Sequence, residues 1–324
     1  MNKKISVIIP MYNSESYIVK TLEAIVNQSY KVFEILLIDD CSQDNGCKIA
    51  EEYLQKQDIK YKIIINEKNS GPSHSRNKGI EESTGDYILF IDSDDLIVPF
   101  YVKHLVLAME QKKYDFVFSD MFECGADVAL DSFSTTLEAK DFGYGSRSDI
   151  IRKHGYSCGC LFKTNIVKEN NIRFCEDCRY MEDNIFNLEY LKSVKSVGYV
   201  KSAVYCYIKY DGSLTHPKDK TALIEKTKKA GIVFEENTNM DYVVSSPKEC
   251  TEFIQSRRYF INCVYGETHT AKYSFDIIKF KLIYEKSAYK KVIKNSNLSF
   301  VKKLQELLML NIKIQELVYK FLLK

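Results

Sequence analysis

Short apolar runs alternate with helix-like periodicity through the first 120 positions of the chain. Runs of strand length occupy positions 5–9, 33–38, 61–65 and 87–91, and they are rich in Val, Ile, Leu and aromatic residues. Runs of this length bounded by turn residues are typical of buried strands. Between them, apolar residues recur at a spacing of three and four, as in Tyr17, Ile18, Leu22, Ile25 and Val26. The alternation predicts βαβ units: an α/β fold with a Rossmann-like, mostly parallel sheet and helices on both faces.

Local signals set the expected ends of these elements. Pro10 lacks a backbone N–H and is expected to close the first strand. Ser14 is expected to cap the helix that follows, because serine hydroxyls accept hydrogen bonds from first-turn amides. A helix carrying Arg76 is expected after the polar loop from Asn66 to Ser75.

The pattern becomes less regular after position 114. Strands are expected at 114–118 and 160–163, a long polar excursion at 120–145, and helices near 165–169 and from Glu182 onward. From about position 221 the pattern is helical. We therefore expect a nucleotide-binding and catalytic domain over 1–213 and a helical C-terminal region over 214–324.

The last stretch of the chain combines a broad apolar face with lysines elsewhere. The apolar positions are Phe300, Leu304, Leu307, Leu308, Ile312, Ile314, Leu317, Val318, Phe321 and Leu322. A basic amphipathic helix of this kind can lie on an anionic membrane surface. The same pattern fits a helix docked on the catalytic domain or in a homodimer.

Composition excludes several classes of protein. The chain has 324 residues, 45% of them hydrophobic and 28% charged, with a formal net charge of +2. These values are ordinary for a globular protein, and so small a charge argues against a nucleic-acid binder. No apolar run reaches the length of a membrane-spanning helix. The first residues resemble a signal peptide, but the apolar part is too short and lacks a small-residue cleavage site, which indicates a cytoplasmic protein.

Carboxylates follow two of the expected strands. Asp40 ends one, and the sequence Asp92-Ser93-Asp94-Asp95 ends another. In open α/β sheets ligands bind at the carboxyl ends of the strands, where these acids fall. Crowded like charges are unfavourable without a cation, and hard divalent ions prefer carboxylate oxygens. The sequence has neither a phosphate-loop nor a dinucleotide-binding motif. It therefore predicts a metal-dependent site for a phosphate-bearing ligand, aided by Arg76.

Two clusters permit two readings each. Cys158, Cys160, Cys175 and Cys178 could supply four thiolates to zinc, although small buried hydrophobes are the commoner role of free cysteines. Glu182 and Asp183 stand in the first turn of an expected helix. They could simply complement the helix dipole, or one of them could act as a general base.

Five ordered blocks resemble family 2 glycosyltransferases. They are Ser6 to Asn13, Ile38 to Ser42, Asn69 to Gly79, Gly85 to Asp95, and Glu182-Asp183. The resemblance covers about positions 5 to 200 and implies a GT-A fold, a nucleotide-sugar donor and an inverting single displacement. Cys41 departs from the pattern, because the family usually has Gly or Asn there, and this puts the local turn in question.

The resemblance also implies roles for individual residues. Pro10, Tyr12 and Glu15 would line the nucleotide pocket, and Asp40 would bond the base, most often uracil. Gly71, Arg76 and Ser93 fall among donor-contacting positions, and Asp92 would lie near the ribose and sugar. Asp94 would ligate Mg²⁺ or Mn²⁺ bridging the diphosphate. Asp183 matches the catalytic base, with Glu182 the less favoured neighbour, and Asp95 is left to cap the next helix. Cys158 and Cys160 fall where residues often face the acceptor.

These roles predict transfer of a sugar, from a UDP-sugar donor, to a hydroxyl of a glycan or lipid-linked glycan during surface polysaccharide synthesis. The enzyme would act in the cytoplasm, or peripherally on the inner face of the cell membrane. One alternative is a catalytically inactive nucleotide-sugar-binding module on the same fold. Another is a nucleotidyltransferase, which would need a Gly-rich basic loop where this chain has Pro10-Met11-Tyr12.

Overall fold

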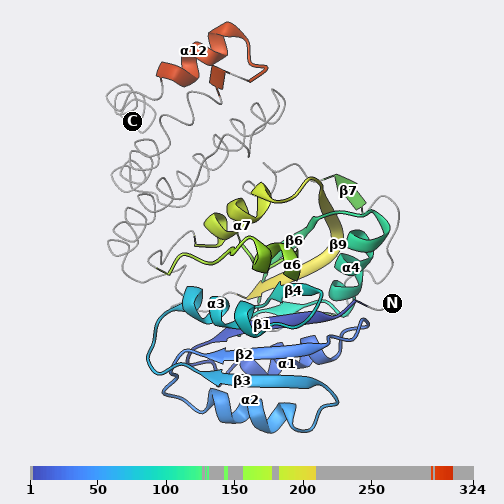
Figure 1. Ribbon diagram of the computed structural model, residues 1–324, viewed down its shortest axis with the longest axis vertical. Coiled ribbons are helices and arrows are strands. Elements are labelled where there is room, and N and C mark those ends of the chain that lie inside the picture. Colours follow the sequence, from blue (N-terminus) through green and yellow to red (C-terminus); the bar gives the residue numbers. More distant parts are fainter. Residues whose placement is uncertain are drawn as a thin grey trace. The chain divides into compact units, whose positions relative to one another are not determined.

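The computed structural model describes residues 3–125, 128, 130, 142–144, 156–176, 182–208, 293–294 and 296–308. The chain forms two compact units, one made of 1–146 with 154–216 and the other of 147–153 with 217–324. The candidate site lies in the first unit, which is shown with its elements labelled in Figure 1.

The first unit alternates strands and helices along its sequence. Its strands are β1 (Ile5–Met11), β2 (Glu34–Asp39), β3 (Lys60–Ile65), β4 (Tyr87–Phe90), β5 (Leu96–Ile97), β6 (Phe116–Cys124), β7 (Phe142–Tyr144), β8 (Cys160–Lys163) and β9 (Val197–Ile208). Its helices are α1 (Ile18–Val26), α2 (Gly46–Leu54), α3 (Pro72–Glu82), α4 (Tyr101–Gln111), α6 (Thr164–Glu169) and α7 (Glu182–Lys192).

The described strands form one sheet in the order β3-β2-β1-β4-β8-β6-β9-β5, with β7 paired to β9. The β3-β2-β1-β4 half is parallel, whereas β8 runs antiparallel to both β4 and β6. The three inner strands of the parallel half are buried throughout, which explains their unbroken apolar runs. The edge strand β3 alternates more exposed with less exposed positions.

Helices cover both faces of the parallel half. The α1 and α2 helices contact each other, and α3 packs on β1 and β2. Because right-handed crossovers lead outward through α1 and α2 and back through α3, the returning helix lies on the opposite face (Figure 1). At Gly79 this helix touches the sheet, since a Cβ there would lie 2.3 Å from Ile8 Cγ2.

An aromatic cluster joins the sheet to α7. The Phe174 and Phe186 rings stack with centroids 4.1 Å apart, and Phe90 meets both edge-on at 5.1 and 5.6 Å. Phe162 packs against Phe90 and Phe186. Buried aromatic pairs contribute about 1 kcal/mol each beyond their area. The cluster therefore fixes α7 and the segment at 172–176 against the end of β4.

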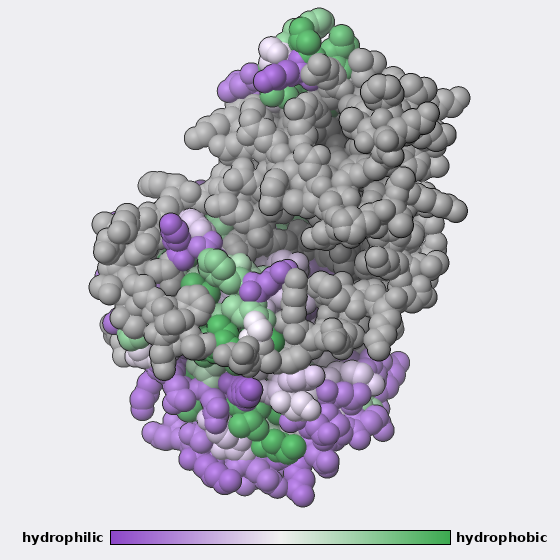
Figure 2. Space-filling model, turned by 180° about the vertical axis from the view of Figure 1, so that it is seen from behind, coloured by the Kyte–Doolittle hydropathy of each residue, from purple (hydrophilic) through white to green (hydrophobic). Residues whose placement is uncertain are grey.

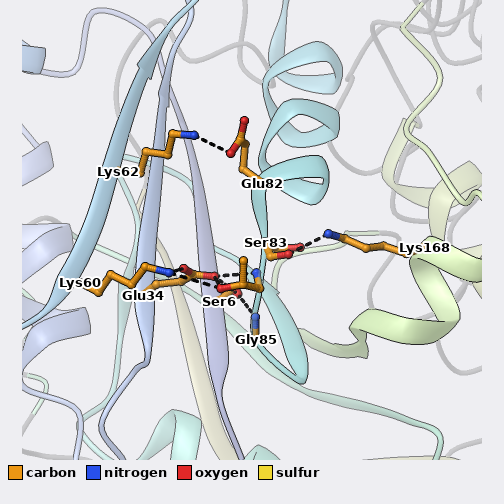
Figure 3. Close-up of polar contacts among 9 residues, drawn as sticks. Ser6, Glu34, Lys60, Lys62, Glu82, Ser83, Gly85 and Lys168 are labelled. Atoms are coloured by element: carbon orange, nitrogen blue, oxygen red, sulfur yellow. Dashed lines mark hydrogen bonds and ion pairs between the residues drawn. The ribbon is translucent and has the colours of Figure 1, made fainter.

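At the amino edge of the sheet, a buried carboxylate is fully surrounded by donors (Figure 3). Glu34 accepts hydrogen bonds from Ser6 Oγ at 2.7 Å, Lys60 Nζ at 2.6 Å, and Thr84 N and Oγ1 at 2.7 and 2.8 Å. Burial by itself raises the pKa of Glu34, but these donors outweigh it and hold the pKa below its usual value. This cluster is a structural tie between β1, β2, β3 and the turn before β4.

Several expected element ends are wrong. Helix α3 begins at Pro72, inside the loop expected up to Ser75, and β6 continues to Cys124, into the excursion expected from position 120. The first strand runs through Pro10 to Met11, because β1 bonds β2 as far as Met11 opposite Asp39. Ser14 does not cap α1 with its hydroxyl: Tyr17 is the N-cap, and the Ser14 Oγ lies 2.8 Å from Ser93 Oγ instead. The Ser14 hydroxyl thus bonds the buried Ser93 hydroxyl rather than the first-turn amides of α1.

The second unit is described only at 293–294 and 296–308. Helix α12 (Phe300–Leu308) leaves Phe300, Val301 and Leu304 exposed. The rest of the expected amphipathic stretch lies outside the described residues, so membrane docking and dimerisation stay predictions.

Figure 2 shows one face of the molecule coloured by hydropathy. Seen from behind, the described surface is largely hydrophilic with small apolar areas (Figure 2). Within the described residues, no helix has the length and apolarity needed to cross a membrane.

Candidate active site

The acids expected at the carboxyl edge lie there on two strands that flank β1. Asp40 directly follows β2, and its N–H donates to Met11 O at 2.8 Å. On the other side, Ile91 N donates to Ile8 O at 3.1 Å, so Asp92 emerges just beyond the end of β4. Parallel pairing with the central strand thus brings both acids to one edge of the sheet.

The turn Asp92-Ser93-Asp94-Asp95 is held from the α1 side through Ser93. The Ser93 and Ser14 hydroxyls lie 2.8 Å apart, and Thr21 Oγ1 donates to Ser93 O at 2.9 Å. Ser93 is buried. In this structure Ser93 therefore anchors the acidic turn to the start of α1.

Asp95 holds the same turn from the β9 side and does not cap a helix. It is buried and accepts hydrogen bonds from Tyr205 Oη at 2.7 Å and from Ile208 N at 2.9 Å. The Tyr205 hydroxyl in turn accepts the Asp92 N–H at 3.1 Å. Burial, with the charges of Asp92 and Asp94, raises the pKa of Asp95 well above its usual value. Tyr205 was missed from sequence, because its partner lies 110 residues away.

Arg76 is the one basic side chain that the described structure places among these acids. It is buried on α3, and its Nη2 donates to Asp92 Oδ1 at 2.8 Å. Its Nη1 lies 3.4 Å from Glu182 Oε1 and 3.8 Å from Asp183 Oδ1. The Phe174 ring lies 5.3 Å from its Cζ. Burial lowers the pKa of Arg76, but Asp183 and Asp92 more than offset it and keep the guanidinium charged.

Glu182 and Asp183 begin α7 and face Arg76 from the other side. Burial and the neighbouring Asp183 raise the pKa of Glu182 to about 7, although Arg76 opposes the shift. Burial also raises the pKa of Asp183, while Arg76 and hydrogen bonds from Ser157 act against it. The Ser157 hydroxyl donates to Asp183 Oδ1. A mere helix-dipole role would not require this burial, and perturbed carboxylates of this kind cluster at functional sites.

Two of the four clustered cysteines lie in this site as neutral thiols. Cys158 and Cys160 are buried, and burial raises both thiol pKa values well above the usual range. Cys178 lies outside the described residues. Within the part of the chain that the structure describes, no three His, Cys, Asp or Glu side chains form a group that could hold a metal. Cys158 and Cys160 thus behave as buried hydrophobes, whereas Cys175 is partly exposed.

On the nucleotide side, Asp40 organises the loop before α3. It is buried and accepts hydrogen bonds from Asn66 Nδ2 at 2.9 Å, Ser70 N at 3.0 Å and Gly71 N at 2.7 Å. Gly71 is the N-cap of α3 with a φ of 92°, a conformation that favours glycine. In this structure Asp40 therefore shapes the wall of the expected base pocket.

The 12–15 and 41–45 loops pair with each other beside that wall. Asn13 N donates to Ser42 Oγ at 2.9 Å, and Asn45 N donates to Glu15 Oε2 at 3.0 Å, so Glu15 caps the start of α2. Tyr12 remains 48% exposed. Cys41 has a φ of 63°, the left-handed region, which explains why Gly or Asn suits this position.

Asp94 is the acid of this turn that is expected to bind a metal ion. It is partly buried, and burial together with the Asp92 charge raises its pKa to about 6. Arg76 contacts Asp92 and leaves Asp94 without a cationic partner among the described residues. A carboxylate that is costly to ionise and has hard oxygen donors fits Mg²⁺ or Mn²⁺.

Comparisons with known proteins identify the family to which the chain is similar. The family model described as "Glycosyl transferase family 2" matches residues 6–170. The chain is 29% identical over 232 residues to the uncharacterized glycosyltransferase EpsJ of Bacillus subtilis, covering 69% of this chain and 67% of EpsJ. It is 30% identical over 208 residues to TarS of Staphylococcus aureus, a poly(ribitol-phosphate) beta-N-acetylglucosaminyltransferase, covering 63% of this chain but 35% of TarS.

The fold is also that of a solved relative. The crystal structure of S. aureus TarS 1–349 in complex with UDP superposes with a TM-score of 0.68 at 20% identity, covering 98% of this chain and 90% of that one. The expected GT-A fold is therefore confirmed, with a sheet that is mixed beyond its parallel half.

Proposed function

The chain belongs to glycosyl transferase family 2, and from that premise we propose that it is an inverting, metal-dependent glycosyltransferase. One observation carries the proposal: Arg76 joins Asp92 of the acidic turn to Glu182 and Asp183 of α7. The largely buried Asp183 carboxylate thus lies on the opposite side of the Arg76 guanidinium from the turn that would hold the donor. This is the arrangement that transfer to a hydroxyl requires.

The donor we propose is a UDP-sugar. Tyr12 would stack on the base, while Pro10, Glu15, Asp40 and Gly71 would form the pocket around it. The relative TarS is named as an N-acetylglucosaminyltransferase and was crystallised with UDP, which supports this donor class. Asp92 and Arg76 would contact the ribose and sugar, and Ser93 would keep their turn in place.

Asp94 would hold Mg²⁺ or Mn²⁺ at the donor diphosphate. A bound divalent ion there neutralises charge on the leaving diphosphate. The protein's own contribution is to present Asp94 on a turn that Ser93 and Asp95 fix from two sides. Such pre-organisation avoids reordering the carboxylate during the reaction.

Asp183 would serve as the general base. As the acceptor oxygen bonds to the anomeric carbon, the bond from that carbon to the diphosphate oxygen breaks, and the hydroxyl proton passes to the Asp183 carboxylate. Attack from the face opposite the leaving group inverts the anomeric configuration without a covalent intermediate. Glu182 is the second candidate, but Ser157 holds Asp183 and not Glu182 among the described contacts.

The acceptor we propose is a hydroxyl of a glycan or lipid-linked glycan in surface polysaccharide synthesis. Supporting this, TarS is named for transfer to poly(ribitol-phosphate). The reaction would take place in the cytoplasm, where nucleotide sugars are available, or at the inner face of the membrane. Residues 1–213 would carry it out, and 214–324 would form the helical accessory region.

A panel of UDP-sugars tests the proposal. UDP release from UDP-N-acetylglucosamine, UDP-glucose and UDP-galactose is measured with Mn²⁺, with Mg²⁺ and with EDTA. We expect release from at least one donor, loss of release in EDTA, and at least a hundredfold loss in Asp94→Asn. Asp58→Asn, an exposed aspartate in the turn before β3, is the matched control and should behave as wild type.

The same panel separates the alternative. An inactive nucleotide-sugar-binding module would bind UDP by calorimetry and release none from any donor. Retention of a buried base beside Arg76 favours the enzyme, because binding alone has no use for it. Donor turnover that persists fully in EDTA would contradict metal dependence.

A further inference from the structure

The segment that enters β8 is tied twice to the helix that carries the base. The Ser157 hydroxyl donates to Asp183 Oδ1, and Asn187 Nδ2 donates to Tyr156 O at 3.0 Å. Asp183 and Asn187 are four residues apart, so they lie one above the other on the same face of α7. Two consecutive residues of the segment therefore bind two consecutive turns of the helix.

The Ser157 contact is enclosed. Ser157 is fully buried, and Asn187 is 1% exposed. A buried hydroxyl beside a largely buried carboxylate has little competition from solvent, and a hydrogen bond to an ionised group is roughly twice as strong as a neutral one. Nη1 of Arg76 lies 3.8 Å from the same Oδ1, so this oxygen is held from both α3 and the β8 segment.

We propose that Ser157 is a positioning residue for the base: its hydroxyl orients the Asp183 carboxylate for proton transfer, and Asn187 keeps Ser157 in register with α7. The inference rests on the proposed function, because it needs Asp183 to accept the acceptor proton. Neither residue belongs to the motif blocks that carry the family resemblance.

The charged and titratable groups that face Asp183 come from every neighbouring element. They are Arg76 on α3, Asp92 after β4, Glu182 on α7, Cys158 before β8 and Cys160 on β8. Asp92 and Glu182 disfavour the ionised carboxylate, so stabilisation comes from Arg76 and Ser157. Removing the Ser157 hydroxyl should therefore raise the pKa of Asp183.

The test is a pH profile of Ser157→Ala. Turnover of the UDP-sugar that gives the fastest UDP release is measured from pH 5 to pH 9 at saturating donor. We expect kcat to fall about tenfold at neutral pH and the acidic limb to move up by about one pH unit, since the lost bond is charge-assisted. The KM for the donor should change less than twofold, because the side-chain hydrogen bond described for Ser157 goes to Asp183 and not to a residue of the donor pocket.

Two further variants frame this result. Ser157→Thr keeps a hydroxyl and should return the limb toward wild type. Ser83→Ala removes another buried hydroxyl, which donates to Ile80 O at 2.7 Å far from the site, and should leave the limb unmoved. A purely structural role of Ser157 would lower the melting temperature without displacing the limb, and that outcome overturns the inference.

Asp183→Asn separates this inference from the proposed function. If Asp183→Asn is inactive and Ser157→Ala has an unshifted limb, the base assignment stands and the positioning role is wrong. If Asp183→Asn keeps full turnover, both the assignment of Asp183 as the base and the positioning role of Ser157 are wrong. Should Ser157→Ala melt below the assay temperature, Ser157→Cys provides a weaker donor of similar size, and an unshifted limb there counts equally against the role.

Discussion

The two edges of the sheet both bury carboxylates, with opposite electrostatic results. At the amino edge, Glu34 receives four hydrogen bonds, one of them from Lys60, and its pKa is lowered (Figure 3). At the carboxyl edge, Asp94, Glu182 and Asp183 share space with one buried arginine, and their pKa values are raised. The hydrogen bonds at the amino edge stabilise the ionised carboxylate. At the carboxyl edge the ionised carboxylates are less favourable, and a bound cation or a proton would stabilise them.

The largest difference should appear in activity after one carboxylate is changed to its amide. Asp183→Asn removes the proposed proton acceptor, and general bases contribute about 10²–10⁴-fold. We expect turnover to fall about a thousandfold, with UDP affinity by calorimetry unchanged. The melting temperature should not fall, because the native site disfavours the ionised form of Asp183. A clear drop in melting temperature would break the contrast between the edges.

The same chemical change at the amino edge should act on stability instead. Glu34→Gln replaces one acceptor oxygen with a donor that faces either Lys60 or the Ser6 and Thr84 donors, and we expect a loss of about 2 kcal/mol in the free energy of unfolding. Urea denaturation measures it. Glu82→Gln is the control, because Glu82 also meets a lysine at 2.6 Å but with both side chains partly exposed to solvent, where ion pairs contribute little. Equal losses in both would show that burial does not distinguish them.

A tyrosine at each edge offers a finer comparison. Tyr205 and Tyr190 are both buried, and each hydroxyl accepts one backbone N–H and donates one hydrogen bond. Tyr205→Phe frees the turn that carries Asp92 and Asp95, so UDP binding with Mn²⁺ should weaken about tenfold. Tyr190→Phe should lose comparable stability and bind UDP normally. Equal weakening in both would assign the effect to general loosening.

The smallest expected effect is a pH dependence of opposite sign at the two edges. Glu182 has a pKa of about 7 in the folded chain, above its unfolded value, so the folded state binds more protons and its stability rises as the pH falls from about 7 to 5. Glu34 has a lowered pKa, so its contribution is present above the unfolded value and is lost as the pH falls below about 4.5.

Without donor or metal, stability should therefore peak at mildly acidic pH. Activity needs an ionised base and should be higher near neutral pH. Urea unfolding across pH 4 to 8, beside a kcat profile, checks this. The Glu182→Gln variant should lose the rise between pH 7 and 5, and a rise that persists would assign it to another group.

The parallel half of the fold could be predicted from sequence because its signals are local. Apolar runs ending in Asp40 and Asp92 mark strands directly, and the parallel pairing of β1 with β2 follows from a short crossover. The return of β4 to the other side of β1 has no such local signal. The antiparallel insertion of β8 beside β4 could not be predicted, since the sequence of Cys160–Lys163 carries no signal of which strand it pairs with. The hydroxyl partner of Ser14, Ser93, likewise comes from the tertiary structure.

In the candidate site, too, some residues have local signals in the sequence and others depend on tertiary contacts. Its charged members, such as Arg76, Asp92 and Asp183, are recognised by residue type and spacing. The residues that hold them are ordinary serines and tyrosines, such as Ser157 and Tyr205, whose partners are 26 and 110 positions away. A hydroxyl in a short apolar stretch gives no sign of what it will bond. Support for an active site is therefore harder to find in sequence than the site itself.

Gly79 lets α3 pack directly against the sheet, because it has no side chain at the point of contact. Its missing side chain lets the helix rest on Ile8, and Arg76, one turn earlier, is thereby brought level with Asp92 and Asp183. An alanine at 79 would have to lift the helix from the strand, and the guanidinium would withdraw with it from both halves of the site. The placement of Arg76 between the donor side and the base thus depends on the absence of a side chain at position 79, although Gly79 itself is not among the proposed substrate-contacting residues.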